Sequence, residues 1–219
     1  YSQKVLLYAI TSRVLLPGKE TERQAALVDL AHHWAQGGVD YIQIREKDLP
    51  PSDLLALSRR IVSAVRKESS ATRVLVNGPA DIALEAQADG VHLPSSAPVG
   101  AAERTRQVFR STGREALVSR ACHSLEEIRV ATQVSLVVFA PVFEKVGEEV
   151  TDSATRPRVG PGIGIDALRE ACLAAHPIPV IGLGGVTTAN APACIAAGAT
   201  GVAGIRLFLG DDWRQLRSL

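Results

Sequence analysis

Two apolar runs near the end of the chain, residues 178–183 and 201–207, most constrain the fold. Both contain β-branched residues, as expected for strands buried on both faces of a parallel sheet, and a helical segment at residues 187–197 separates them. The first run is followed by Gly184 and Gly185, and the second contains Ala203 and Gly204. Because glycine lets backbone N–H groups approach an anion, the pattern predicts a phosphate site. Helix ends and tight turns are an alternative reason for these glycines.

Strands and helices alternate along the whole chain. The apolar runs predict strands at residues 5–11, 39–45, 73–77, 90–93, 116–119, 136–139, 180–183 and 202–206. Helices are expected between them, among them residues 20–36, 52–68 and 124–132, the last opened by a capping box of Ser124 and Glu127. Eight strand–helix units favour one α/β domain over residues 1–219, a single (β/α)8 TIM barrel. A phosphate site after strands seven and eight recurs in that fold.

Composition limits the classes of function. The chain has 219 residues, is 46% hydrophobic and carries a net charge of +1, so neither nucleic acid nor a membrane is expected as a partner. No apolar run approaches the ~18 residues that span a bilayer, and no secretory signal is recognisable. Three scattered cysteines favour a reducing, cytoplasmic location. We therefore expect a small-molecule ligand, and the sequence leaves a homo-oligomer open.

Polar residues follow several of the expected strands, where the active sites of TIM barrels lie. Strand two ends in Gln43, Arg45 and Lys47, which alternation places on one side. If that side faces the barrel mouth, three donors converge on an anionic ligand; otherwise they form a solvated charged loop. Asn77 ends strand three, and His123 follows strand five. No His pair has ligand spacing with Cys, so no metal site is predicted.

Several motifs, in order, resemble the thiamine phosphate synthase superfamily. They are Gln-x-Arg-Glu-Lys at 43–47, Leu-Val-Asn-Gly-x-x-Asp-Ile-Ala-Leu at 75–84, Asp-Gly-Val-His-Leu-Pro at 89–94, Pro-Val-Phe at 141–143, and the terminal Gly-Gly and Gly-Val-Ala signatures. The similarity runs from residue 8 to residue 208. It implies a TIM barrel of thiamine biosynthesis that binds a thiazole phosphate.

Two enzymes share that superfamily, and the chain departs from the first of them. The synthase joins a pyrimidine diphosphate to thiazole phosphate with Mg²⁺, which carboxylates hold. Gly78 stands where the synthase has Asp, residues 94–97 lack its next Asp, and Ala121 replaces its Ser. Its Thr-x-Thr-Lys loop is replaced by the acidic residues 144–149, within a connection (140–164) that we expect to be mobile over the mouth. We therefore expect no cofactor, with Mg²⁺ only under the synthase alternative.

The second enzyme, thiazole tautomerase, is the better match. Its pattern resembles Asn-Gly at 77–78, Leu-Pro-Ser at 93–95 and His-Ser-Leu-Glu-Glu at 123–127. In the tautomerase that His transfers a proton, which implies the same role for His123. An imidazole with a pKa of about 6.5 can take and return a proton at neutral pH. The alternative is a histidine that merely lies at a helix N-terminus.

The sequence therefore predicts a thiazole tautomerase-like isomerase that aromatises a thiazole carboxylate phosphate by His-mediated proton transfer. Thiamine phosphate synthase, or a non-catalytic regulator that binds thiazole or thiamine phosphates, is the alternative. His92 is expected to be structural or a wall of the pocket, and Arg206, where the superfamily usually has Ser, adds a phosphate contact or narrows the site. The expected site consists of His123 as catalytic residue, Gln43, Arg45, Lys47 and Asn77 for the substrate, and Gly184, Gly185, Ala203, Gly204 and Arg206 for the phosphate.

Overall fold

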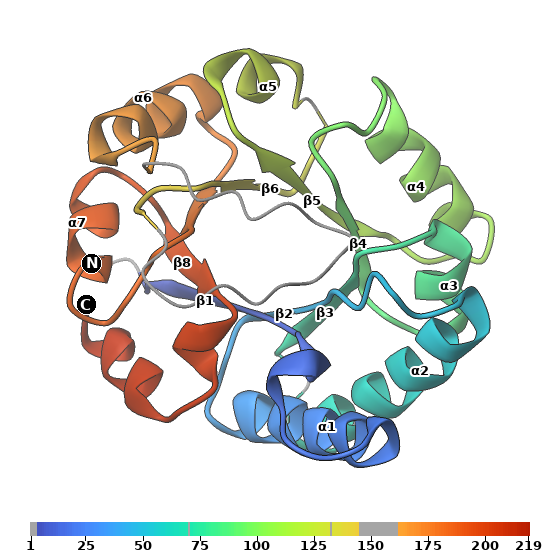
Figure 1. Cartoon of the computed structure of the whole chain (residues 1–219). Helices are drawn as coiled ribbons and strands as arrows, with labels where there is room; N and C mark the ends of the chain where they lie inside the picture. The colour runs from blue at the N-terminus through green and yellow to red at the C-terminus, as the bar shows by residue number, and fades with distance from the viewer. Residues whose placement is uncertain (1–3, 70, 132, 145–161) are drawn as a thin grey trace.

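Eight parallel strands close into a barrel in which each strand pairs with its neighbours in sequence and β8 returns to β1. The computed structural model describes residues 4–69, 71–131, 133–144 and 162–219. The strands are β1 (Leu6–Ile10), β2 (Tyr41–Ile44), β3 (Arg73–Val76), β4 (Gly90–Leu93), β5 (Leu117–Cys122), β6 (Leu136–Phe139), β7 (Val180–Leu183) and β8 (Gly201–Gly204). Figure 1 shows them at the centre of a ring of helices. The predicted TIM barrel is confirmed.

The helices of the ring follow the strands in order. They are α1 (Glu20–Gln36), α2 (Pro51–Glu68), α3 (Ala80–Glu85), α4 (Ala101–Arg110), α5 (Leu125–Val130), α6 (Ile165–Ala175) and α7 (Ala191–Ala196). A short 3₁₀ helix, η1 (Arg13–Leu15), precedes α1. Pro51 suits the first position of α2, because that N–H has no partner within a helix.

The eighth strand–helix unit differs from the prediction. After β8 come two 3₁₀ helices, η2 (Arg206–Phe208) and η3 (Asp212–Ser218), in place of an α-helix. Phe208 and Trp213 are fully buried there, and the Trp34 Nε1–H of α1 donates to the Phe208 carbonyl at 2.8 Å. The rings of Trp34, Phe208 and Trp213 pack on one another and belong to the main apolar core.

Several predicted boundaries were wrong. The last strand ends at Gly204 and not at residue 206, because Ile205 takes a helical backbone conformation (φ −97°, ψ −67°). Strand β5 continues past the predicted residue 119 to Cys122, which pairs with Phe139 of β6. Helices α5 and α7 are each six residues long, shorter than predicted. The long connection at 140–164 was expected to be mobile. Residues 145–161 of it lie outside the described part of the chain, so this expectation stays a prediction.

The apolar side chains form two layers. The larger cluster lies between the strands and the surrounding helices. The smaller cluster fills the barrel and is formed by every second residue along the strands. It contains Tyr8, Ile10, Leu75, Leu136, Val138, Ile181 and Ala203. This alternation shows which side of each strand faces the barrel interior. Across the described residues, no helix is long and apolar enough to cross a membrane.

Candidate active site

A buried hydrogen-bonded cluster lies inside the barrel beneath its C-terminal end. The Tyr8 hydroxyl of β1 donates to Gln43 Oε1 of β2 at 3.1 Å, and it lies 3.1 Å from Ser119 Oγ of β5. His92 Nδ1 of β4 lies 2.8 Å from the same Ser119 Oγ. Because Tyr8 occupies the amide oxygen of Gln43, the amide NH₂ of Gln43 stays available as a donor. Sequence reasoning found Gln43 but missed Tyr8 and Ser119.

His92 is neutral in this cluster. Burial, with the positive charges of Arg45 and Lys47 as smaller causes, lowers its pKa to about 3. Loss of hydration and the charge of Arg45 likewise lower the pKa of Lys47. The charges of Arg45 and Lys47 act on His92, so these two residues after β2 lie at the same end of the barrel as the buried cluster. Asn77, half-buried at the end of β3, donates its backbone N–H to Ile44 of β2 and so stays at the same end of the barrel.

The buried state of His92 predicts a specific loss of stability in acid. Its folded pKa of about 3 lies below the unfolded value, so between about pH 6.5 and 3 the unfolded chain binds a proton that the native state does not. From pH 7 to pH 5 this should cost about 2 kcal/mol of unfolding free energy.

Urea unfolding at both pH values checks this cost. His92→Gln should lack that part of the pH dependence, whereas His176→Gln, at an exposed position, should keep it. Equal pH dependence in the wild type and His92→Gln would contradict the assignment.

His123 follows β5 and is held by two hydrogen bonds. Its Nδ1 lies 2.7 Å from the Ala140 carbonyl at the end of β6, and its backbone N–H donates to Glu127 Oε2 at 2.6 Å. A carbonyl oxygen can only accept, so Nδ1 carries the proton and Nε2 of the neutral ring keeps its lone pair. One of the two hydrogen bonds of the predicted capping box is present, because Ser124 Oγ accepts the Glu127 N–H. The other is replaced, because the Glu127 carboxylate accepts the backbone N–H of His123 instead of that of Ser124.

Two successive backbone N–H groups, those of Gly185 and Val186, lie in the loop after β7. The Gly184 carbonyl accepts the Phe143 N–H at 2.9 Å, and the Gly185 carbonyl accepts Asn190 Nδ2 at 2.9 Å. Since C=O and N–H of a trans peptide point in opposite directions, the N–H groups of Gly185 and Val186 face away from those partners. Within the described ranges neither N–H makes a hydrogen bond. Successive N–H groups arranged in this way favour an anion.

The predicted phosphate residues also have packing roles. A Cβ on Gly184 would lie 2.7 Å from Pro141 Cα, and one on Gly204 would lie 2.8 Å from Leu207 Cβ. Both glycines are thus required for close packing, a role distinct from the helix ends and tight turns of the alternative explanation. Ala203 is fully buried inside the barrel. Arg206 is exposed and begins η2 instead of ending β8.

Asp81 and Asp89, the acidic residues that follow β3 and precede β4, each have other partners in the structure. Asp81 Oδ1 accepts the Ile82 N–H in the first turn of α3. Asp89 precedes β4 at the opposite end of the barrel, where it pairs with Arg66 and Arg73. No group of three or more His, Cys, Asp or Glu side chains in the described part of the chain could hold a metal ion. The acidic stretch 144–149 lies outside the described residues except for Glu144.

Comparison with known proteins places this chain in a family. A family model described as thiamine monophosphate synthase matches residues 7–208. The chain belongs to this family, whose enzymes act in thiamine biosynthesis. A thiamine-phosphate synthase of Methanoculleus marisnigri is 34% identical over 94% of this chain and 88% of its own length. A thiamine-phosphate synthase of Moorella thermoacetica is 33% identical over 93% and 88%.

A solved structure shows the same fold. The thiamine phosphate pyrophosphorylase of Pyrococcus furiosus superposes with a TM-score of 0.73 at 24% identity, over 98% of this chain and 93% of that one. The names of these relatives support the synthase alternative more directly than the tautomerase.

Proposed function

We propose that this protein is a thiazole tautomerase-like isomerase, which aromatises a thiazole carboxylate phosphate by moving one proton. The observation that carries the proposal is the fixed tautomer of His123. Its Nδ1–H is engaged by the Ala140 carbonyl, so Nε2 is the basic atom. Nε2 takes the proton from the ring carbon beside the carboxylate and returns a proton to the exocyclic carbon. The Ala140 carbonyl stabilises the imidazolium that forms between the two transfers.

The substrate's two anionic groups fit two different ends of the site. The N–H groups of Gly185 and Val186, with Ala203 and Gly204 of the adjacent strand β8 and Arg206 after them, would bind the phosphate. Gln43, Arg45, Lys47 and Asn77 would bind the carboxylate from the β2–β3 side. No described hydrogen bond joins His123 to these residues. In this proposal it is the substrate that connects the two sides of the barrel.

Thiamine phosphate synthase is the second candidate, and the names of the relatives favour it. The Gln43, Arg45 and Lys47 set would suit a diphosphate as well as a carboxylate. Against it stands the lack of carboxylates at Gly78 and at residues 94–97, where the resemblance expects the Mg²⁺ ligands. A non-catalytic binder of thiazole or thiamine phosphates would use the same phosphate loop without the proton transfer.

Direct conversion of the proposed substrate separates an enzyme from a binder. The purified protein would be incubated with the non-aromatic thiazole carboxylate phosphate, and the aromatic product followed by proton NMR. We expect turnover above the spontaneous rate in the presence of a metal chelator. Binding of the compound without any acceleration would support the regulator and refute the isomerase.

A further inference from the structure

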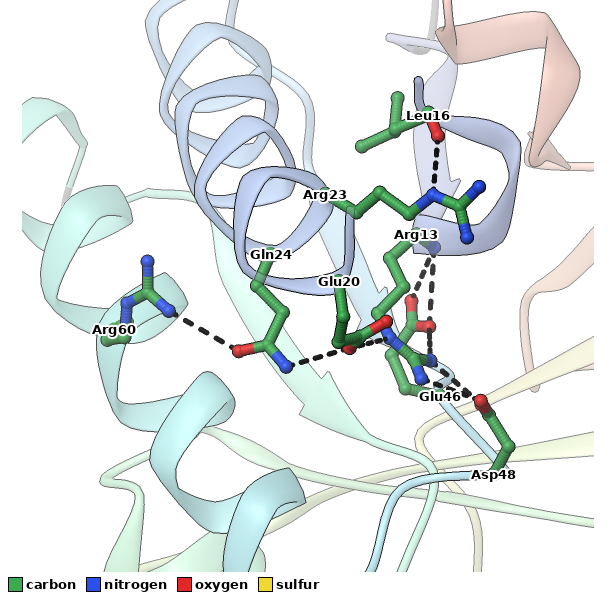
Figure 2. Close-up of polar contacts among 8 residues, drawn as sticks. All are labelled: Arg13, Leu16, Glu20, Arg23, Gln24, Glu46, Asp48 and Arg60. Carbon is green, nitrogen blue, oxygen red and sulfur yellow. Dashed lines mark hydrogen bonds and ion pairs between the residues drawn. The ribbon is translucent and has the colours of Figure 1, made fainter. Parts of the chain in front are cut away.

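Arg13 of η1 is a buried cation surrounded by carboxylates (Figure 2). It is 4% exposed. Its Nε donates to Glu20 at 2.6 Å, its Nη1 to Glu46 at 2.9 Å, and Nη1 and Nη2 together hold both oxygens of Asp48 at 2.8 and 2.6 Å. The bidentate contact raises the pKa of Arg13 and lowers that of Asp48. Arg13 thus connects the loop after β1 to the loop after β2.

Backbone contacts strengthen the same connection. The Glu46 side chain is 2% exposed and also accepts the backbone N–H of Arg13, at 3.1 and 3.3 Å from its two oxygens. One residue earlier, the backbone N–H of Arg45 donates to Thr11 Oγ1 at 2.9 Å. The segment 45–48 is therefore held from the β1 side through both its main chain and its side chains.

The acidic and basic side chains of this segment have different surroundings. Glu46 and Asp48 turn to Arg13, whereas Arg45 and Lys47 lie near His92, whose pKa their charges help to lower. A buried carboxylate without a partner is strongly unfavourable. Without Arg13, the buried Glu46 would therefore compete for Arg45 and Lys47 and draw them from the barrel mouth, and the exposed Asp48 would add a second negative charge beside them.

We propose that Arg13 is a positioning residue, which keeps Arg45 and Lys47 available for an anionic ligand by occupying the carboxylates of Glu46 and Asp48. The inference rests on the proposed function only in taking Arg45 and Lys47 as the binding site for the substrate's second anionic group. It needs no assumption about the reaction, since a carboxylate and a diphosphate would both use these cations.

Calorimetric titration with inorganic pyrophosphate tests the inference without an activity assay. Arg13→Gln should raise the dissociation constant about tenfold, the loss expected for a charge-assisted contact. The effect should disappear in an Arg45→Gln/Lys47→Gln background, because nothing is left to position. Adding Glu46→Gln and Asp48→Asn to Arg13→Gln should restore most of the affinity, because the competing carboxylates are gone.

Controls separate positioning from a general loss of structure. Arg59→Gln removes an exposed ion pair with Glu85 on α2 and α3 and should leave the affinity unchanged. If Arg13→Gln does not fold, Arg13→Lys, which keeps the charge but cannot hold both oxygens of Asp48, should still weaken binding about threefold. Equal effects of the Arg13 substitution in both backgrounds, or no recovery in the triple variant, would overturn the proposal. Failure of the proposed function would show separately, as absence of isomerisation by the wild type.

Discussion

Replacing His123 by Gln is expected to lower the isomerisation rate by about 10²–10⁴-fold, the usual contribution of a general acid–base group. Glutamine keeps a similar size and polarity but cannot take up a proton at neutral pH. The substrate affinity should change little, because His123 is assigned to the reaction and not to either anionic group. The measurement is the rate of aromatic product formation under saturating substrate, with circular dichroism as the check of folding.

His176→Gln is the matched control for that substitution. This histidine is exposed at the end of α6, and its variant should retain the full rate. A loss of less than about threefold in His123→Gln would make His123 a bystander. Cys122 would be a poor replacement as the base, because burial raises the pKa of its thiol to about 11.

Substitution of Gly185 by Ala or Val should abolish binding of phosphate esters, with a loss of affinity of about 100-fold or more. Gly185 has φ +62°, and a Cβ there would lie 2.4 Å from the Glu144 carbonyl oxygen and 2.8 Å from Phe143 Cβ. The loop must therefore shift, which turns the N–H groups of Gly185 and Val186 out of line. Titration with thiazole phosphate measures the effect.

Gly113 provides a control with the same backbone strain. Its φ is +74°, no heavy atom lies within 4 Å of an added Cβ, and it precedes β5 at the opposite end of the barrel. Gly113→Ala should lower stability slightly and leave phosphate affinity intact. Unchanged affinity in a folded Gly185→Ala variant would remove this loop from the phosphate site.

The sequence predicted the barrel because each buried strand is a short apolar run with turn signals on both sides. It predicted the ends of strands less well. Strand β5 was predicted to end at residue 119, before the charged Arg120. The strand in fact continues, because the Arg120 side chain points away from the barrel interior and donates to the carbonyls of Ser95 and Ala97. Ile205 is apolar and β-branched, but the chain turns there into η2. Both outcomes depend on packing between elements, which local pattern does not contain.

The polar cluster and the Arg13 network were not predicted for a related reason. Tyr8 meets Gln43 and Ser119 across 35 and 111 residues of chain, and only the closure and stagger of the barrel bring their side chains together. A signal for Tyr8 did exist, because it carries a hydroxyl group at a β1 position whose side chain points into the barrel. For Arg13 the signal was the run Arg45-Glu46-Lys47-Asp48 after β2. Two acidic side chains so close to a buried strand need a cationic partner.

The most direct test of the whole account is a paired assay of the wild-type protein for its two candidate reactions. One reaction supplies the non-aromatic thiazole carboxylate phosphate with a chelator, and the other supplies pyrimidine diphosphate and thiazole phosphate with Mg²⁺. Displacement of a diphosphate needs a cation to stabilise the leaving charges, and neither Gly78 nor residues 94–97 offer a carboxylate where the resemblance expects the ligands of that cation. We expect aromatisation in the first reaction and no thiamine phosphate in the second. Robust Mg²⁺-dependent formation of thiamine phosphate, without aromatisation, would contradict this expectation.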